Sequence, residues 1–135
     1  ITSNGSTITD STARNNGAYG IYAGSGSTVR RCTAQYNTGD GIQVVNDCTV
    51  AANTCNSNGA SGDGAGIFAY FTDNRIEDNH VTDNDRGIDV DNGGNIIVRN
   101  TASGNGTDYD IASGNDVGTI RTSPVGAGAW DNFRF

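Results

Sequence analysis

The chain repeats itself almost from end to end, and this repeat constrains its fold more than any other feature. Within each repeat one apolar position recurs at steps of 21, 21, 26 and 21 residues. The members of this column are Ile8, Val29, Val50, Ile76 and Ile97. A period of this length is typical of a solenoid, in which each unit buries its apolar side only against its neighbours.

Each repeat also holds a short segment that opens with isoleucine and alternates in polarity. Examples are GIYA from Gly20, GIQVV from Gly41 and GIDVD from Gly87. Alternation with period two is typical of a strand with one buried face. The one long step coincides with a glycine-rich stretch, which predicts an insertion loop over residues 59–66. We therefore predict an all-β fold, a parallel β-helix of about six coils.

An unbroken asparagine column runs in phase with the apolar one. In a stack of coils, equivalent side chains lie about 4.8 Å apart. Each amide can then hydrogen-bond to the next and satisfy turn backbone inside the wall. Asparagine also tolerates the left-handed conformation that such corners require. The predicted ladder consists of Asn16, Asn37, Asn58, Asn84 and Asn105.

The composition excludes other fold classes and several partners. The 135 residues include eight arginines and no lysine, leucine or methionine, so an α-helical domain is excluded. The net charge of −7 argues against nucleic acid and against an anionic membrane surface as partners. No apolar run is long enough to insert into a membrane.

The cadence of residues 79–91 and 100–106 resembles the right-handed parallel β-helix superfamily, which has the pectin-lyase-like fold. That superfamily includes polysaccharide lyases, glycoside hydrolases and many surface proteins. The resemblance implies a right-handed solenoid in an extracellular or cell-surface protein. It says little about function, because the repeat consists of core and corner residues. We interpret the chain as the C-terminal part of a longer secreted or surface protein.

The two ends of the solenoid are expected to differ. Residues 1–125 are predicted to form the coils, with Ile120 and Val125 in a sixth segment. Residues 126–135 are predicted to cap the last coil with the aromatic side chains of Trp130, Phe133 and Phe135. At Ile1 no capping segment is recognisable. We therefore expect upstream coils or another copy of the chain to stack at the N-terminal end.

An acidic pair supplies the strongest candidate for chemistry. Asp89 and Asp91 flank Val90, so both side chains should project from the same outer strand face. Their spacing is close to that of the paired carboxylates of inverting glycoside hydrolases. If the protein is an enzyme, we expect Asp89, Asp91 and Arg86 to be its catalytic residues. The alternative is a solvated acidic face that keeps the solenoid soluble.

Aromatic side chains are expected on the same outer face, in the preceding coils. Carboxylates beside exposed rings resemble the sugar-binding grooves of the superfamily. We therefore predict a polysaccharide-binding surface. Its residues are Tyr22, Phe68, Tyr70, Asp89 and Asp91.

No metal or other cofactor is expected. The aspartate-rich loops lack the ligand pattern of a calcium-binding EF-hand, although weak divalent-cation binding at Asp89 and Asp91 stays open. Cys32, Cys48 and Cys55 do not have zinc-site spacing, and we expect buried thiols. A disulfide from Cys55 to either of the other two also stays open.

Three functions are compatible with the sequence. The first is a non-catalytic structural or adhesive module that contacts carbohydrate. The second is a polysaccharide lyase or glycoside hydrolase whose groove runs over the strand face. The third is a filament subunit that assembles through its open N-terminal coil.

Overall fold

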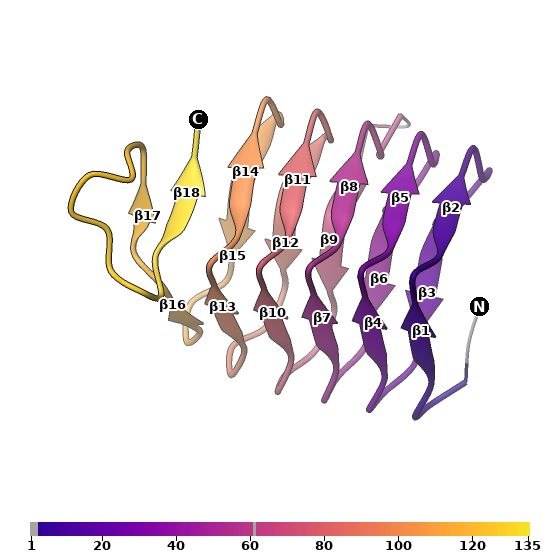
Figure 1. Cartoon of the computed structure of the whole chain (residues 1–135). Coiled ribbons are helices and arrows are strands. Elements are labelled where there is room, and N and C mark those ends of the chain that lie inside the picture. Colours follow the sequence, from indigo (N-terminus) through magenta and orange to yellow (C-terminus); the bar gives the residue numbers. More distant parts are fainter. Residues whose placement is uncertain (1–2, 61) are drawn as a thin grey trace.

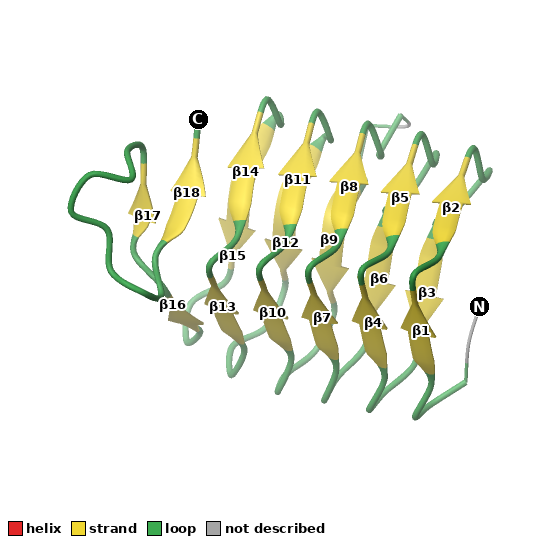
Figure 2. Ribbon diagram, viewed as in Figure 1, coloured by secondary structure: helices red, strands yellow, loops and turns green. Residues whose placement is uncertain are grey.

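The computed structural model describes residues 3–60 and 62–135. Figure 1 shows flat coils stacked along one axis, with the N-terminal coil at one end and the C-terminal strands at the other. All regular elements of the described residues are strands, with no helix among them (Figure 2). Five complete coils each give one strand to three sheets, and a sixth coil begins after them. The predicted parallel β-helix is therefore confirmed.

The three sheets, named A, B and C here, are parallel and pair neighbouring coils in register. Sheet A contains β1 (Thr7–Thr9), β4 (Thr28–Arg30), β7 (Thr49–Ala51), β10 (Arg75–Glu77), β13 (Ile96–Val98) and β16 (Asp116–Val117). Sheet B contains β2 (Thr12–Arg14), β5 (Thr33–Gln35), β8 (Thr54–Asn56), β11 (His80–Thr82), β14 (Thr101–Ser103), β18 (Asn132–Arg134) and β17 (Ile120–Arg121). Sheet C contains β3 (Ile21–Ala23), β6 (Ile42–Val44), β9 (Ala65–Ala69), β12 (Arg86–Val90) and β15 (Thr107–Ile111).

The core is a thin apolar column inside the three sheets. The apolar column of the sequence lies in sheet A, where strand register places Val29 beside Val50 and Ile76 beside Ile97. All four side chains are fully buried. Valine, isoleucine and alanine fill the column because parallel strands buried on the inner face favour short, branched side chains.

The predicted asparagine ladder forms along the corner between sheets B and C. The side-chain amide of Asn58 donates to Oδ1 of Asn84 at 2.9 Å, and that of Asn84 donates to Oδ1 of Asn105 at 2.9 Å. The backbone N–H of Asn58 donates to the same Asn84 oxygen, also at 2.9 Å. Each step of the ladder thus satisfies a buried turn amide and a side chain together.

Two further ladders, not predicted from the sequence, occupy the other two corners. One runs through Asn53, Asn79, Asn100 and Asn132 between sheets A and B. The other runs through Asn74, Asn95 and Asn115 between sheets C and A. Each ladder ends on a cysteine whose backbone N–H donates to the next asparagine, Cys32 in the first and Cys48 in the second. All three cysteines are buried free thiols.

The left-handed corner residues are not the ladder asparagines, contrary to the prediction. In the three ladders, the residue just before each asparagine other than Asn132 has the positive φ angle. Asn58 follows Ser57 at φ 54°, and Asn84 follows Asp83 at φ 57°. The asparagine itself keeps ordinary backbone geometry because its side chain must turn inward along the ladder. The left-handed position before the asparagine, which is unfavourable for residues with a Cβ atom, carries varied residue types, including arginine, tyrosine and alanine.

In sheet C, the glycine that precedes the first isoleucine of a strand makes room for the ladder. A methyl group added at Gly66 would lie 2.7 Å from Nδ2 of Asn84. At Gly41 the same group would lie 2.7 Å from Nδ2 of Asn58. Both distances are too short for a carbon atom, so the glycine of each of these pairs is a packing requirement of the ladder.

The C-terminal segment differs from the predicted cap and from the predicted boundary at residue 125. Val117, rather than Ile120, pairs with Ile97 in the apolar column, and Val125 is 83% exposed in a loop. The tail returns as β18, which inserts between β14 and β17 in sheet B. A strand inside this sheet is thus drawn from residues predicted to lie outside the coils.

The three aromatic residues of this segment do not gather over the end of the core. Phe133 pairs with Thr101, at an outward position, and its ring stacks 6.1 Å from that of Phe135. Trp130 is 58% exposed and lies beneath the guanidinium of Arg99. At the other end of the solenoid, β1, β2 and β3 are the edge strands of the described residues. The expectation built on Ile1 lies outside the described residues.

Candidate functional site

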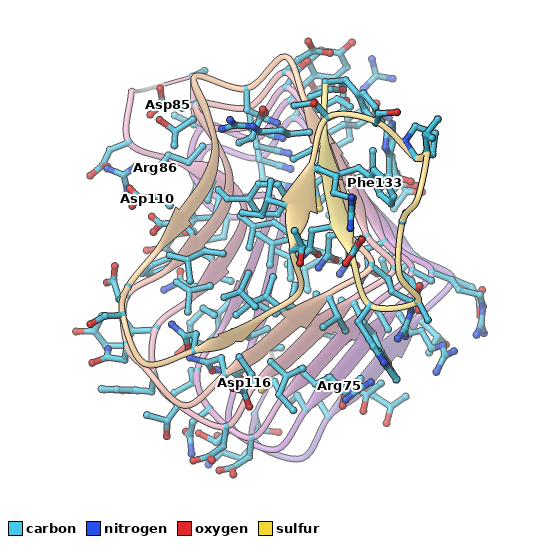
Figure 3. All side chains as sticks on the ribbon, turned by 90° about the vertical axis from the view of Figure 1, so that its left-hand side faces the viewer. Arg75, Asp85, Arg86, Asp110, Asp116 and Phe133 are labelled. Atoms are coloured by element: carbon cyan, nitrogen blue, oxygen red, sulfur yellow. The ribbon has the colours of Figure 1, made fainter. Side chains whose placement is uncertain are left out.

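A pocket of about 280 Å³ is hollowed into the outer face of sheet C. It spans four coils and is lined by Tyr19, Gly39, Asp40, Gln43, Asp63, Phe68, Arg86, Asp89 and Asp91. In the view along the solenoid axis, Arg86 and Asp110 lie together on one side, away from Arg75 and Asp116 of sheet A (Figure 3).

Two of the lining side chains belong to one column of sheet C. Asp40, Ala65 and Arg86 each lie two residues before the inward isoleucine of their strand, and those isoleucines pair in register. Asp40 and Arg86 line the pocket, whereas Ala65 between them is buried and does not. The insertion loop brings Asp63 to the rim, where it pairs with Arg86.

Asp40 is buried beneath this loop, with only 8% of its surface exposed. Its Oδ1 accepts a hydrogen bond of 2.7 Å from the backbone N–H of Ala65. Burial, together with the negative charges of Asp89 and Asp63, raises the pKa of Asp40 to about 6. The hydrogen bond from Ala65 and the charge of Arg86 act in the opposite direction.

Arg86 is surrounded by carboxylates. Its Nη1 lies 2.7 Å from Asp89, its Nη2 lies 2.9 Å from Asp63, and its Nε lies 3.6 Å from Asp110. Asp89 is 5% exposed, and burial raises its pKa even though Arg86 beside it acts to lower it. Arg86 therefore holds the desolvated carboxylate of Asp89 in place, and the positive charge of Arg86 is balanced by carboxylates of the protein itself.

The pocket brings together part of the set predicted from the sequence. Asp89, Asp91, Arg86 and Phe68 all line it. Asp89 and Asp91 do not form an equivalent pair, however, since Asp89 is buried and ion-paired while Asp91 is exposed beyond the end of β12.

Tyr22 and Tyr70 lie beside the pocket rather than in its lining. The ring of Tyr70 is 5.9 Å from that of Phe68, and the ring of Tyr22 is 6.2 Å from that of Tyr19. Tyr70 also makes an edge contact with Phe71 at 4.4 Å, and both rings are nearly half exposed. The aromatic surface thus continues past the pocket to the next corner of the coil.

Sequence reasoning missed five lining residues as site members, namely Tyr19, Gly39, Asp40, Gln43 and Asp63. Gln43 pairs with Phe68 in register on the outer face, and its Oε1 is buried with no hydrogen-bond partner. Asp40 was detectable as the acidic member of the column that contains Arg86. Asp63 had no such signal, because its position depends on the path of the insertion loop.

The described residues contain neither a metal cluster nor a membrane-spanning helix. Over residues 3–60 and 62–135, no three histidine, cysteine or acidic side chains are grouped so that they could hold a metal ion. No helix in these ranges has the length and apolarity of a membrane span. Weak divalent-cation binding at Asp89 and Asp91 stays a prediction.

Comparison with known families gives one match. The family model described as "Right handed beta helix region" matches residues 1–120. Neither the curated proteins nor the solved structures give a match.

Proposed function

Because this chain belongs to the right-handed β-helix family, whose fold supplies a scaffold and no fixed chemistry, we propose its function from the pocket itself. The proposed function is that of a non-catalytic adhesive module, which binds carbohydrate on the outer face of sheet C. The observation that carries this proposal is a pocket in which rings and carboxylates meet. Phe68 and Tyr19 offer apolar ring faces, and Asp40, Asp89 and Gln43 offer hydrogen-bond acceptors. Sugars present one apolar face and several hydroxyl donors, so they suit this mixture.

The rigidity of the scaffold supports a binding role. The pocket lies on strands that are hydrogen-bonded to neighbouring coils on both sides, and its wall is fixed by the asparagine ladder. A preformed site loses little conformational entropy when ligand binds. The exposed rings of Tyr70 and Phe71 extend the surface along one coil, as a chain of several sugar units requires.

A second candidate is a glycoside hydrolase, which one observation favours. Asp40 has a pKa raised to about 6, in the range of a general acid that works near neutral pH. Asp89 lines the same pocket as a second buried carboxyl group. Hydrolysis would need one of them to protonate the leaving oxygen and the other to activate water or attack the sugar.

A glycan array followed by calorimetric titration tests the proposal. We expect at least one oligosaccharide to bind without cleavage, and Phe68→Ala to weaken that binding about ten-fold or more. Phe135→Ala, which removes an exposed ring next to sheet B, should leave it unchanged. An empty array would refute carbohydrate binding. Cleavage that Asp40→Asn abolishes would replace the binding role with the hydrolase.

A further inference from the structure

We infer that the ligand of the sheet C pocket is an amino sugar with a free, protonated amine, rather than a uronate or a fully acetylated sugar. This inference rests on the proposed carbohydrate-binding function and names the ligand class of the same site. It depends on two independent features of the pocket. Its one basic side chain is already paired with carboxylates of the protein, and one of its hydrogen-bond acceptors has no donor.

The first feature is the charge that remains after internal pairing. Among the described lining residues, Arg86 is the one basic side chain, and it already contacts Asp89 and Asp63. It also lies within 3.6 Å of Asp110 at the edge of the site. One positive charge thus serves three carboxylates, so the pocket as a whole stays negative. A uronate would bring a further carboxylate into this field without a free cation to receive it.

The second feature is the hydrogen-bonding capacity of the pocket. Oε1 of Gln43 is buried and accepts no hydrogen bond from the described residues. A buried carbonyl oxygen without a donor is unfavourable, and a ligand donor that reaches it removes this penalty. The carboxylates of Asp89 and Asp91 are also acceptors. The pocket therefore needs donors, and an ammonium group supplies three N–H donors and no acceptor.

The aromatic lining suits the same ligand. Phe68 pairs with Gln43 on the neighbouring strand, and both residues line the pocket. An ammonium group over the face of the Phe68 ring would gain a cation–π contact in addition to the hydrogen bonds. An N-acetyl group would instead remove the charge and two of the three donors.

The test compares three tetrasaccharides by calorimetry at pH 6. These are tetramers of glucosamine, of N-acetylglucosamine with the same linkage, and of galacturonate. We expect the glucosamine tetramer to bind at least ten-fold more tightly than the other two. Binding should also release protons, because a bound cation lowers the pKa of Asp40, which faces Asp63, Arg86 and Asp89. Repeating the titration in buffers of different ionisation enthalpy measures this release.

A matched pair of variants separates the pocket from general attraction to an acidic protein. Asp91→Asn removes an exposed charge from the pocket, and Asp116→Asn removes an exposed charge from sheet A. We expect Asp91→Asn to weaken glucosamine binding about three-fold and Asp116→Asn to have little effect. Gln43→Met should also weaken it, and Gln43→Glu should strengthen it. Equal losses in the two aspartate variants would overturn the inference.

The outcomes distinguish this inference from the function on which it rests. If the acetylated or uronate tetramer binds most tightly, the ligand class is wrong while carbohydrate binding stands. If no tetramer binds and the glycan array is also empty, carbohydrate binding itself fails, and the inference fails with it.

Discussion

Oδ2 of Asp89 lies 2.7 Å from Nη1 of Arg86, three residues earlier on the same strand. The side chain of Asp89 is 8% exposed and that of Arg86 is 36% exposed, so the pair joins a desolvated carboxylate to a solvated cation. The contact therefore matters more to Asp89 than to Arg86. Without the arginine, a buried carboxylate would lose its nearest counter-charge.

We predict that Arg86→Met lowers the free energy of unfolding by about 3 kcal/mol at pH 8. The loss should be smaller at pH 5. The folded-state pKa of Asp89 is already raised, and removing Arg86 raises it further, so the native state takes up a proton there. A raised carboxyl pKa stabilises the native state at low pH, and that contribution disappears as the pH rises. Urea unfolding at the two pH values measures both effects.

Arg31→Met is the matched control. Arg31 makes a similar ion pair with Asp10, but the side chains of both residues in this pair are more than half exposed. Exposed pairs contribute little, so this variant should unfold like the parent protein at both pH values. If the two variants lose the same stability, burial of Asp89 does not determine the importance of Arg86.

Asp40 is predicted to titrate near pH 6 in the folded protein. Its folded pKa is higher than the ordinary carboxyl value, so its contribution to stability is present at low pH and is lost between about pH 4 and 6. Asp40→Asn should flatten this part of the stability profile while keeping an acceptor for the Ala65 N–H. Carbon-13 titration of the side chain gives the midpoint directly. A midpoint near 4 would contradict the raising of the pKa by burial and by neighbouring Asp89 and Asp63, which Arg86 only partly offsets.

The fold was predictable from the sequence wherever a whole column kept one residue type. The ladder from Asn16 to Asn105 is uninterrupted and was recognised. The other two ladders were not, because cysteines occupy one of their positions each and their last steps are irregular. Asn100 and Asn132 are 32 residues apart, and Asn95 and Asn115 are 20 apart. A fixed period of 21 cannot find partners at those distances.

The site was less predictable than the fold for a physical reason. Alternation along a strand identifies side chains on the outer face, and it found Asp89, Asp91 and Phe68. It does not report whether neighbouring coils leave room beside them. The pocket depends on side chains from four neighbouring coils and on the insertion loop that carries Asp63 to Arg86. Neither effect lies within a single strand.

The ladder is expected to be a major source of stability. Asn84 accepts from the backbone N–H and side-chain amide of Asn58, and it donates to Asn105 and to the Cys55 carbonyl. Asn84→Ala leaves several buried polar groups without partners, so we predict a loss of about 3 kcal/mol in the free energy of unfolding. Asn16→Ala, at the exposed end of the same ladder, should cost less than half as much. Urea midpoints compare them, and equal losses would show that the interior of the ladder has no special weight.

The left-handed corners predict a stabilising substitution. Ala52 is exposed and has a φ of 55°, a conformation that is unfavourable for a residue with a Cβ and free of strain for glycine. Ala52→Gly should therefore raise the free energy of unfolding by about 1 kcal/mol, even though glycine increases the entropy of the unfolded chain. Ala18→Gly is the control, since Ala18 is also exposed but is not left-handed, and this variant should be neutral or destabilised. Thermal and urea unfolding of both variants decide the matter. If both substitutions destabilise the protein alike, the backbone of Ala52 is not strained by its left-handed conformation.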